Sequence, residues 1–434
     1  MTRIMKRYPA YKESGIEWLG EIPLQWEMVK LRHIANLINE KAEGSSSDNN
    51  LQIALENIEG FTGRLISRGE FGGAGNRFEK GDVLFNKLRP YLCKAVIAPE
   101  NGTAVGELLV LRPTNQLNNR FLLYRLLSDD FISIVDGSTY GAKMPRASWE
   151  FIGNLKIPAP SLAEQQAIAD YLDRKTAVID SLIAKKERQI ELLQEQRTGV
   201  INQAVTRGLD PQVPLKESGI PWLGRIPSHW ETGKFQYVTT LVQTGPFGSQ
   251  LHFSDYVENE IPIINPSNIQ DTQIIPDWAR CISQKTLKRL NRHKLSEGDI
   301  VFARRGEMGR CALVTAVEDG WLCGTGSIKL CLDRSKAYPP YIIALLSNQG
   351  VREWLELESV GSTMANLNTE IISRIPIPLI PVEEQKSIVA FVEDKQAKFD
   401  RLVEINVQLI EKLQEYRTAV ISAAVTGKID VRDL

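Results

Sequence analysis

The 434-residue sequence lacks long apolar runs and paired cysteines. No stretch approaches the roughly 18 consecutive apolar residues of a membrane helix, and no apolar segment follows the basic N-terminal residues. We therefore expect neither a membrane span nor a secretory signal. The five cysteines are odd in number and form no CxxC pair, so we expect free thiols and a cytoplasmic protein.

The motifs of catalysis are absent as well. A DNA amino-methyltransferase needs Asn or Asp before two prolines and an aromatic residue, but the only Asn-Pro pair, Asn265-Pro266, precedes Ser267. The sequence has no glycine-rich phosphate loop, and its four histidines are scattered without an HExxH motif. Cys323 and Cys331 have a poor spacing for zinc and are expected to be small core residues. The sequence thus predicts no catalytic residue, no metal site and no enzyme.

Charge does not identify a partner. The chain has 52 basic and 53 acidic residues; the net charge is +2 for residues 1–161 (20 basic, 18 acidic) and zero for residues 214–380 (17 of each). Any affinity for DNA must come from local placement of Lys and Arg or from partner subunits.

The chain contains an internal repeat about 200 residues long. Residues 12–27 return as residues 216–231 with twelve of sixteen positions identical, and the segment 81–85 returns as 298–302. From Gly141 to Asp210 the second copy follows at a constant offset of 220. The offset is only 204 at the start, so the middle of each copy diverges while both flanks persist. This favours two related modules with different tasks, although a fused dimer without a functional split is an alternative.

Each copy ends in a predicted long helix, over residues 162–205 and 382–425, broken or bent near the middle. An apolar heptad seam runs along each helix and is interrupted at matching positions by Lys186 and Arg197 and by Asn406 and Arg417. Such a narrow seam favours packing of the two helices on each other, antiparallel about a pseudo-two-fold axis. The alternative is that each helix docks on its own module.

The module interiors combine short strand patterns with short helices. Strands are predicted at 83–85, 95–97 and 108–111 and at their counterparts 300–302, 312–314 and 328–332. Short helices are predicted at 120–128 and 340–347. Asp82 and Asp299 mark turns that enter a strand. Each module is therefore expected to be α+β.

These repeated pieces resemble the specificity subunit of type I restriction-modification systems, HsdS. The resemblance rests on the Trp-Leu-Gly-x-Ile-Pro block, the Gly-Asp-x-x-Phe segment and the Glu-Gln entry to a long helix, each present twice. Residues 244–251 look like the start of a recognition domain in this family, whereas the first copy has residues 39–51 in that place.

The resemblance implies the following organisation. Target-recognition domains occupy residues 1–160 (here the first module) and 214–380 (the second module), and spacer helix regions occupy 161–213 and 381–434. The two helices form an antiparallel coiled coil, and each module reads half of a split, asymmetric site in double-stranded DNA. The resemblance further implies two methyltransferase subunits (HsdM) and restriction motor subunits (HsdR), which carry S-adenosylmethionine, ATP and magnesium. A stand-alone DNA-modifying enzyme and a coiled-coil scaffold are the alternatives.

Candidate DNA contacts are Arg, Lys, Asn, Gln and Tyr side chains beside glycines or predicted strands, because these side chains read base edges or phosphates. In the first module they are Arg64, Arg77, Asn86, Lys87, Arg89, Tyr91, Lys143 and Arg146. In the second they are Gln243, Ser249, Gln250, Arg304, Arg305, Arg310, Asn366 and Asn368, with a basic cluster of Lys288, Arg289 and Arg292. Each of these could equally be a solvated surface residue, and the cluster an exposed helix face.

Two further groups are expected to be structural. Glu164, Gln165, Glu384 and Gln385 begin the long helices, where acidic residues suit the helix dipole, with partner contact as the alternative. The four tryptophans of the repeated blocks are expected to anchor each block in the core: Trp18, Trp26, Trp222 and Trp230.

Overall fold

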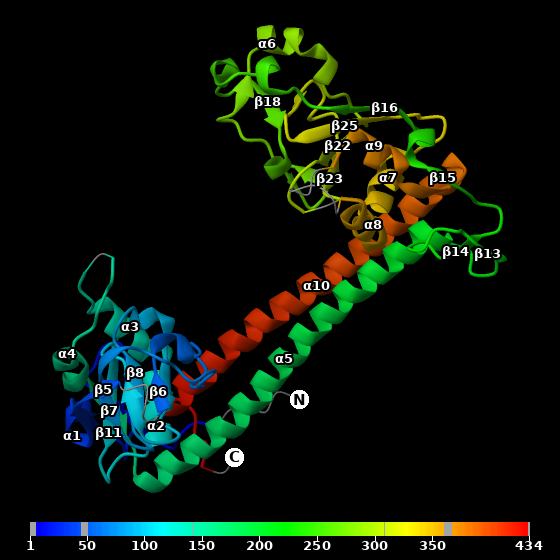
Figure 1. The fold of residues 1–434 in the computed structure, drawn as a ribbon. Helices are drawn as coiled ribbons and strands as arrows, with labels where there is room; N and C mark the ends of the chain where they lie inside the picture. The colour runs from blue at the N-terminus through cyan, green and yellow to red at the C-terminus, as the bar shows by residue number, and fades with distance from the viewer. Residues whose placement is uncertain (1–5, 45–50, 142, 308, 360–366, 433–434) are drawn as a thin grey trace. The chain divides into compact units, whose positions relative to one another are not determined.

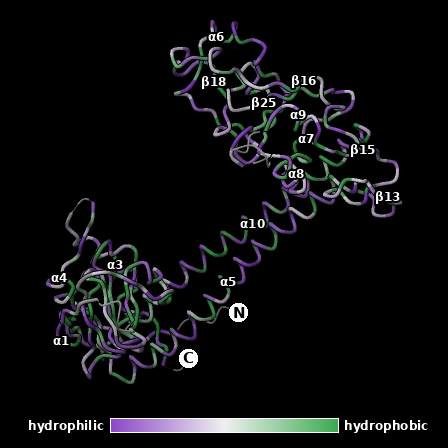
Figure 2. The backbone as a smooth tube through the Cα atoms, in the orientation of Figure 1, coloured by the Kyte–Doolittle hydropathy of each residue, from purple (hydrophilic) through white to green (hydrophobic). Residues whose placement is uncertain are grey.

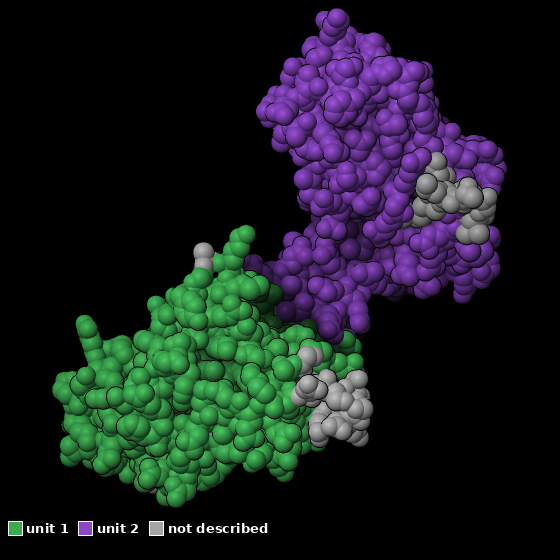
Figure 3. All heavy atoms as spheres, turned by 60° about the vertical axis from the view of Figure 1, so that its left-hand side comes forward, with its two compact units in different colours: residues 1–189, 405–434 green, residues 190–404 purple. Residues whose placement is uncertain are grey.

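A computed structural model describes residues 6–44, 51–141, 143–307, 309–359 and 367–432. The chain divides into two compact units, one of residues 1–189 with 405–434 and the other of residues 190–404 (Figure 3). Each unit therefore contains one module, the first part of one long helix and the last part of the other.

The first module, coloured from blue to cyan in Figure 1, is built around a four-stranded antiparallel sheet in the order β4-β11-β8-β9. Its strands are Ala35–Ile38, Leu108–Pro113, Val83–Asn86 and Ala95–Ile97. Successive side chains of a strand point to opposite faces. Val83 and Phe85 of β8 accordingly join one apolar cluster, while Leu84 joins another. The sheet is covered on both faces, which explains the uninterrupted apolar pattern of β8.

A second sheet in the first module has the order β5-β7-β10-β6, with β6 parallel to β10. Its strands are Lys41–Gly44, Gly73–Phe78, Gly102–Ala104 and Leu51–Ile53. The flanking elements are a hairpin, a strand pair and four helices: β1 Tyr11–Glu13 with β2 Glu21–Pro23, β3 Glu27–Lys30 with β12 Lys156–Ala159, α1 Leu31–Ile34, α2 Asn119–Leu126, α3 Asp129–Gly137 and α4 Trp149–Asn154.

The second module repeats the central sheet as β16-β25-β22-β23, with strands Thr239–Thr244, Ser327–Leu332, Ile300–Ala303 and Cys311–Leu313. Its second sheet is β17-β21-β18-β24, with strands Tyr256–Val257, Cys281–Ile282, Ile261–Ile264 and Leu322–Cys323. The other elements are β13 Leu215–Glu217 with β14 Arg225–Pro227, β15 Glu231–Lys234 with β26 Pro376–Leu379, β19 Ile269–Gln270 with β20 Gln273–Ile274, α6 Gln284–Arg289, α7 Pro339–Leu346, α8 Gln349–Ser359 and α9 Thr369–Arg374.

Strand registers reproduce the sequence repeat. Glu27 pairs with Ala159 in the first module, and Glu231 pairs with Leu379 in the second. These are the same contact, shifted by 204 residues on one strand and 220 on the other. The α+β expectation and the predicted strands and short helices are confirmed.

The long helices are α5, Leu162–Arg207, and α10, Val382–Val425. Each is continuous, so the predicted break near the middle was wrong, whereas the alternative of a bend stays a prediction. Gly199 lies inside α5, since a helix tolerates a single glycine. Figure 2 shows hydrophilic and hydrophobic segments alternating along both helices, as expected for amphipathic helices.

The two helices pack antiparallel on each other within each unit. In the first unit, Nε of Arg417 is 2.9 Å from Oδ1 of Asp180. In the second, Nη1 of Arg197 is 3.2 Å from Oδ1 of Asp400. Each pair is the other shifted by 220 residues, so the same cross-helix contact recurs in both units. Arg197 and Arg417, two of the polar residues that interrupt the predicted apolar seam, therefore form ion pairs with the opposite helix.

Glutamines at the helix entries join each module to its helix. The Nε2 of Gln165 donates to the carbonyl oxygens of Gln116 (3.0 Å) and Pro160 (2.9 Å), and its Oε1 accepts from the N–H of Asn118 (2.8 Å). Gln385 makes the same three bonds with Lys336, Ile380 and Tyr338. Both glutamines are buried, so they act within the chain rather than toward a partner.

Of the four predicted tryptophan anchors, Trp26 and Trp230 are fully buried and Trp222 packs partly buried against the core. The prediction was wrong for Trp18, which is 37% exposed and lies against the guanidinium of Arg125.

Candidate nucleic-acid interface

In the first module, the structure brings two of the predicted candidate segments together. The first candidate loop, residues 87–93, follows β8, and the residues 139–141 and 143–147 precede α4. The N–H of Ala147 donates to the carbonyl oxygen of Lys87 (2.9 Å), and the N–H of Arg89 donates to that of Pro145 (2.8 Å). Nη2 of Arg89 also donates to the carbonyl oxygen of Lys143 (3.3 Å). The two segments thus form one surface.

The backbone of the first candidate loop is held in an uncommon conformation. Arg89 and Cys93 have φ of +52° and +48°, and they bracket a single 3₁₀ turn, Pro90–Leu92. Residues other than glycine rarely adopt positive φ, and such strain clusters at ligand-binding sites. Tyr91 at the tip of this turn is 48% exposed.

Cations and large apolar side chains share this surface. Arg89 and Lys143 are exposed, and so are Tyr140 (65%) and Met144 (55%). Tyr140 and Met144 were not among the predicted contacts, although Tyr140 precedes Gly141 and Met144 follows Lys143 in the sequence. A basic surface with exposed aromatic side chains suits nucleic acid.

Arg146 is engaged within this surface. Its Nη2 lies 2.7 Å from Oε1 of Glu107 and its Nε lies 3.1 Å from Oε2. The Arg146 hydrogen bond lowers the pKa of the Glu107 carboxyl, despite partial burial that acts in the opposite direction. Arg146 therefore enters any complex with its charge already compensated.

Three predicted contacts of the first module lie elsewhere. Asn86 is 1% exposed and its Oδ1 accepts from the N–H of Leu88 (2.9 Å), so it shapes the loop from inside the core. Arg64 forms an ion pair with Asp180 of α5 (2.5 Å). Arg77 is exposed on β7, outside the surface made by the loop.

The second module has a matching arrangement. Its candidate loop, residues 304–307 with 309–310, follows β22, and the N–H of Leu367 donates to the carbonyl oxygen of Arg304 (3.0 Å). This is the Ala147–Lys87 contact of the first module with different side chains. Arg304 lies over the ring of Phe247, 5.3 Å from its centroid, and burial followed by the charge of Arg305 lowers its pKa.

The neighbouring candidates differ in exposure. Arg305 is exposed, whereas Arg310 is partly buried. Asn368 caps α9 by accepting from the N–H of Ile371 (2.8 Å). The predicted contact Asn366 lies outside the described residues.

A second group of candidates in this module gathers around α6. Arg289 donates from Nη1 to the carbonyl oxygen of Gln250 (2.6 Å) and from Nη2 to Asp255 (2.7 Å). The pKa of Asp255 is lowered, mainly by the hydrogen bond from the N–H of His252. Three further candidates are exposed: Ser249, Lys288 and Arg292.

The last two side chains of this module differ in exposure. Gln243 is partly buried, and its Nε2 lies 3.1 Å from Nδ1 of the buried His293. Phe253 is 95% exposed and was not predicted as a contact.

Burial affects several of the cysteine thiols. Burial raises the pKa of the thiols of Cys93, Cys311 and Cys323 to about 12, so they stay protonated at neutral pH. Within the described ranges, no group of three His, Cys, Asp or Glu side chains is placed to hold a metal ion. No helix among these residues is both long and apolar enough to cross a bilayer.

Comparison with known families gives two matches along the chain. The family described as the type I restriction modification DNA specificity domain matches residues 23–192 and 227–415. Each match spans one module and most of the helix that follows it.

Among curated proteins, the chain is 23% identical to the type I restriction enzyme MjaVIII specificity subunit of Methanocaldococcus jannaschii, over 98% of both chains. It is 24% identical to the EcoKI specificity subunit of Escherichia coli K12, over 74% of this chain and 68% of that one.

Solved structures share the fold. The HsdS subunit from Thermoanaerobacter tengcongensis aligns with a TM-score of 0.53 at 19% identity, over 94% of this chain and 98% of that one. A chain from the structural study of complex assembly and conformational transition of the type I R-M system aligns with a TM-score of 0.65 at 19% identity, over 93% and 98%.

Proposed function

Because this chain belongs to the family of type I restriction-modification DNA specificity subunits, we propose that each of its two modules binds one half of a bipartite, asymmetric DNA site. The chain is the DNA specificity subunit of such a system and a non-catalytic component of it.

One observation carries the proposal. The same backbone contact recurs in both modules, between Ala147 and Lys87 and between Leu367 and Arg304, but the side chains of the loops it supports differ. Two modules that recognise different DNA sequences need the same backbone support but different polar side chains. The reason is that base edges are distinguished by the type and placement of hydrogen-bond donors and acceptors.

The candidate contacts divide into two roles. Exposed cations such as Arg89, Lys143 and Arg305 are free of ion pairs in the described structure and suit guanine edges or phosphates. Arg146 and Arg289 are already paired with carboxylates and help to fix the loops. Exposed Tyr91 and Phe253 add apolar contact to bases or sugars.

Membership in the family of type I specificity subunits also suggests which partner subunits bind this chain. We expect two methyltransferase subunits (HsdM) to bind the helices and modules and to bring S-adenosylmethionine, and restriction motor subunits (HsdR) to bring ATP and magnesium. The expected location is the cytoplasm, where the chromosome is modified.

Methylation mapping tests the proposal. The chain is combined with its methyltransferase subunit and S-adenosylmethionine, and methylated positions are mapped on genomic DNA. The expected result is one site with two defined halves and an undefined gap, and no methylation by the chain alone. A single contiguous site, or turnover by the chain alone that a point mutation in it abolishes, contradicts the proposal.

The helices are proposed to set the gap between the halves. Inserting four residues after Ile190 adds about 6 Å of rise to α5 and leaves its seam only about 40° out of phase. Since a base pair spans roughly 3.4 Å, the gap should grow by one or two pairs while each half keeps its sequence. An unchanged gap with full activity contradicts this role of the helices.

A further inference from the structure

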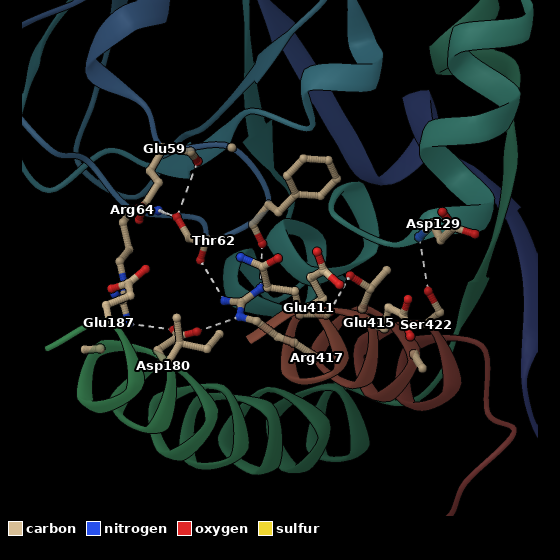
Figure 4. Close-up of a pocket in the computed structure, with 17 residues that line it drawn as sticks. Glu59, Thr62, Arg64, Asp129, Asp180, Glu187, Glu411, Glu415, Arg417 and Ser422 are labelled. Carbon is tan, nitrogen blue, oxygen red and sulfur yellow. Dashed lines mark hydrogen bonds and ion pairs between the residues drawn. The ribbon is translucent and has the colours of Figure 1, made fainter. Parts of the chain in front are cut away.

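Arg417 of α10 is a buried arginine whose bonds reach beyond the partner helix. Its side chain is 6% exposed, and its Nε pairs with Asp180 of α5. Nη1 donates to the carbonyl oxygen of Phe61 (2.5 Å) and Nη2 donates to that of Thr62 (3.1 Å). Figure 4 shows this side chain between the two helices and the loop that carries Thr62. The guanidinium therefore ties the coil to the module backbone.

Arg64 completes the same network. Its Nη2 lies 2.5 Å from the second carboxylate oxygen of Asp180 (Figure 4). Asp180 therefore has two arginine partners, and loss of Arg417 would not leave a buried carboxylate unpaired. The network lines a cavity of about 1000 Å³ between residues 59–64 and the two helices.

The segment held by Arg417 lies directly against the first candidate loop. The N–H of Phe61 donates to the carbonyl oxygen of Cys93 (2.7 Å), the last residue of that loop. A Cβ on Gly60 would come within 2.6 Å of the carbonyl oxygen of Leu92. Phe61 itself has φ of +65°, so its carbonyl and N–H are aimed by an uncommon backbone conformation. A continuous path of bonds thus runs from α10 through Phe61 to the loop that carries Arg89 and Tyr91.

The equivalent arginine of the second unit is placed differently. The side chains of Arg197 and Asp400 are 41% and 61% exposed, so this ion pair is solvated. The second candidate loop is held from within its own module, where Arg352 of α8 pairs with Glu307 (2.8 Å). Arg197 is therefore a matched control for Arg417.

We propose that Arg417 is a positioning residue for DNA recognition: through Phe61 and Cys93 it fixes the first candidate loop relative to the spacer helices. This rests on the proposed function, in which that loop reads one half-site. Lysine at position 417 can keep a charge near Asp180, but it lacks the planar fork that serves a carboxylate and two carbonyls at once. The first module should then hold its loop less firmly, while the second should be unaffected.

The test uses the complex of the full chain with its methyltransferase subunit. The site is first mapped for the wild type, and the half read by the first module is assigned by exchanging residues 30–150 with those of a relative. Methylation rates are then measured on duplexes with the mapped site and on duplexes with single-base substitutions in either half. If the exchange changes neither half, the proposed function fails before Arg417 is tested.

Discrimination is the ratio of the methylation rate on the mapped site to the rate on a duplex with one substituted base. Arg417→Lys is expected to lower this ratio for the half read by the first module by roughly tenfold, which lies within the effect that one mismatched base pair usually has on specific binding. Discrimination at the other half and the rate at saturating cognate DNA should stay at wild-type values, as should all values for Arg197→Lys. Unchanged discrimination at both halves overturns the inference. An equal loss at both halves also overturns it, because that is the signature of a general loss of structure.

Gly60→Ala provides a second route to the same loop. It leaves the helices and Arg417 untouched but places a Cβ against the carbonyl oxygen of Leu92. It should relax discrimination at the same half-site as Arg417→Lys, and hydrogen exchange of residues 87–93 should rise in both variants. If Arg417→Lys prevents assembly of the complex, Gly60→Ala decides: loss confined to the first-module half supports the inference, and any other pattern overturns it.

Discussion

The two modules share the same backbone arrangement, but different side chains stabilise it. Both enter the central strand through an aspartate whose Oδ2 accepts a backbone N–H at 2.8 Å, from Glu79 to Asp82 and from Ser296 to Asp299. Asp82 then forms two hydrogen bonds with Arg112, which is one-third exposed, whereas Asp299 pairs with Lys329, which is nearly buried. Duplication thus preserved the backbone geometry while the charges around it changed.

The same contrast holds where the modules meet the helices. The glutamine networks are identical, because they bind backbone atoms that every copy must present. The cross-helix arginines differ, since Arg417 is buried and reaches the module whereas Arg197 is solvated. The glutamine contacts and the cross-helix ion pair recur in both units, whereas the bonds from the arginine to the module backbone are found for Arg417 in the described structure and not for Arg197.

The largest difference is expected at the strand-entry turn. Asp299→Ala leaves the buried ammonium of Lys329 without its carboxylate, and should cost about 3–5 kcal/mol in the free energy of unfolding of the second unit. Asp82→Ala should cost the first unit about 1–2 kcal/mol, because Arg112 retains solvent and Glu79 at 3.1 Å. Urea unfolding of the full-length variants gives both values. Equal losses would mean that the burial of the cation does not govern the cost.

Equal effects are expected at the helix entries. Gln165→Ala and Gln385→Ala each remove three hydrogen bonds between a buried side chain and the backbone, and each should cost about 2–3 kcal/mol in the unit concerned. The comparison is made by urea unfolding, with Gln196→Ala at an exposed position of α5 as the control. A difference of more than about 1 kcal/mol between the two variants would show that the networks are not equivalent.

A smaller difference is expected at the buried tryptophans. Nε1 of Trp230 donates to Oε1 of Glu384 (3.0 Å), whereas Nε1 of Trp26 is buried without an acceptor among the described residues. Replacement by phenylalanine removes a similar volume from both cores, so Trp230→Phe should cost about 1 kcal/mol more than Trp26→Phe. Thermal unfolding of the two variants checks the order, and the reverse order would contradict it.

The two long helices and their packing on each other were predicted well from the sequence, for physical reasons. A heptad seam and a constant offset of 220 report on the helices directly, because packing depends on periodicity and not on detailed geometry. Matching polar interruptions at Arg197 and Arg417 also pointed to a paired arrangement, although their partners Asp180 and Asp400 could not be named without the antiparallel register.

The candidate interface was predicted less completely. Proximity to glycines and strands identified Arg89 and Lys143, which the structure brings together, but it could not tell the exposed Arg89 from the buried Asn86 three residues earlier. Exposure at a strand end depends on which way the chain turns, and that turn is set by distant contacts such as those of Phe61 with Cys93 and Arg417. Such long-range contacts leave no local pattern in the sequence.

The central claim is that the two modules read DNA independently on a common frame. The most direct measurement is to replace residues 30–150 by the matching segment of a relative with a different specificity, and to map methylation by the complex with the methyltransferase subunit. The account predicts that one half of the site changes to that of the donor, while the other half and the gap stay as in the wild type. A change in both halves, or in neither, would contradict it.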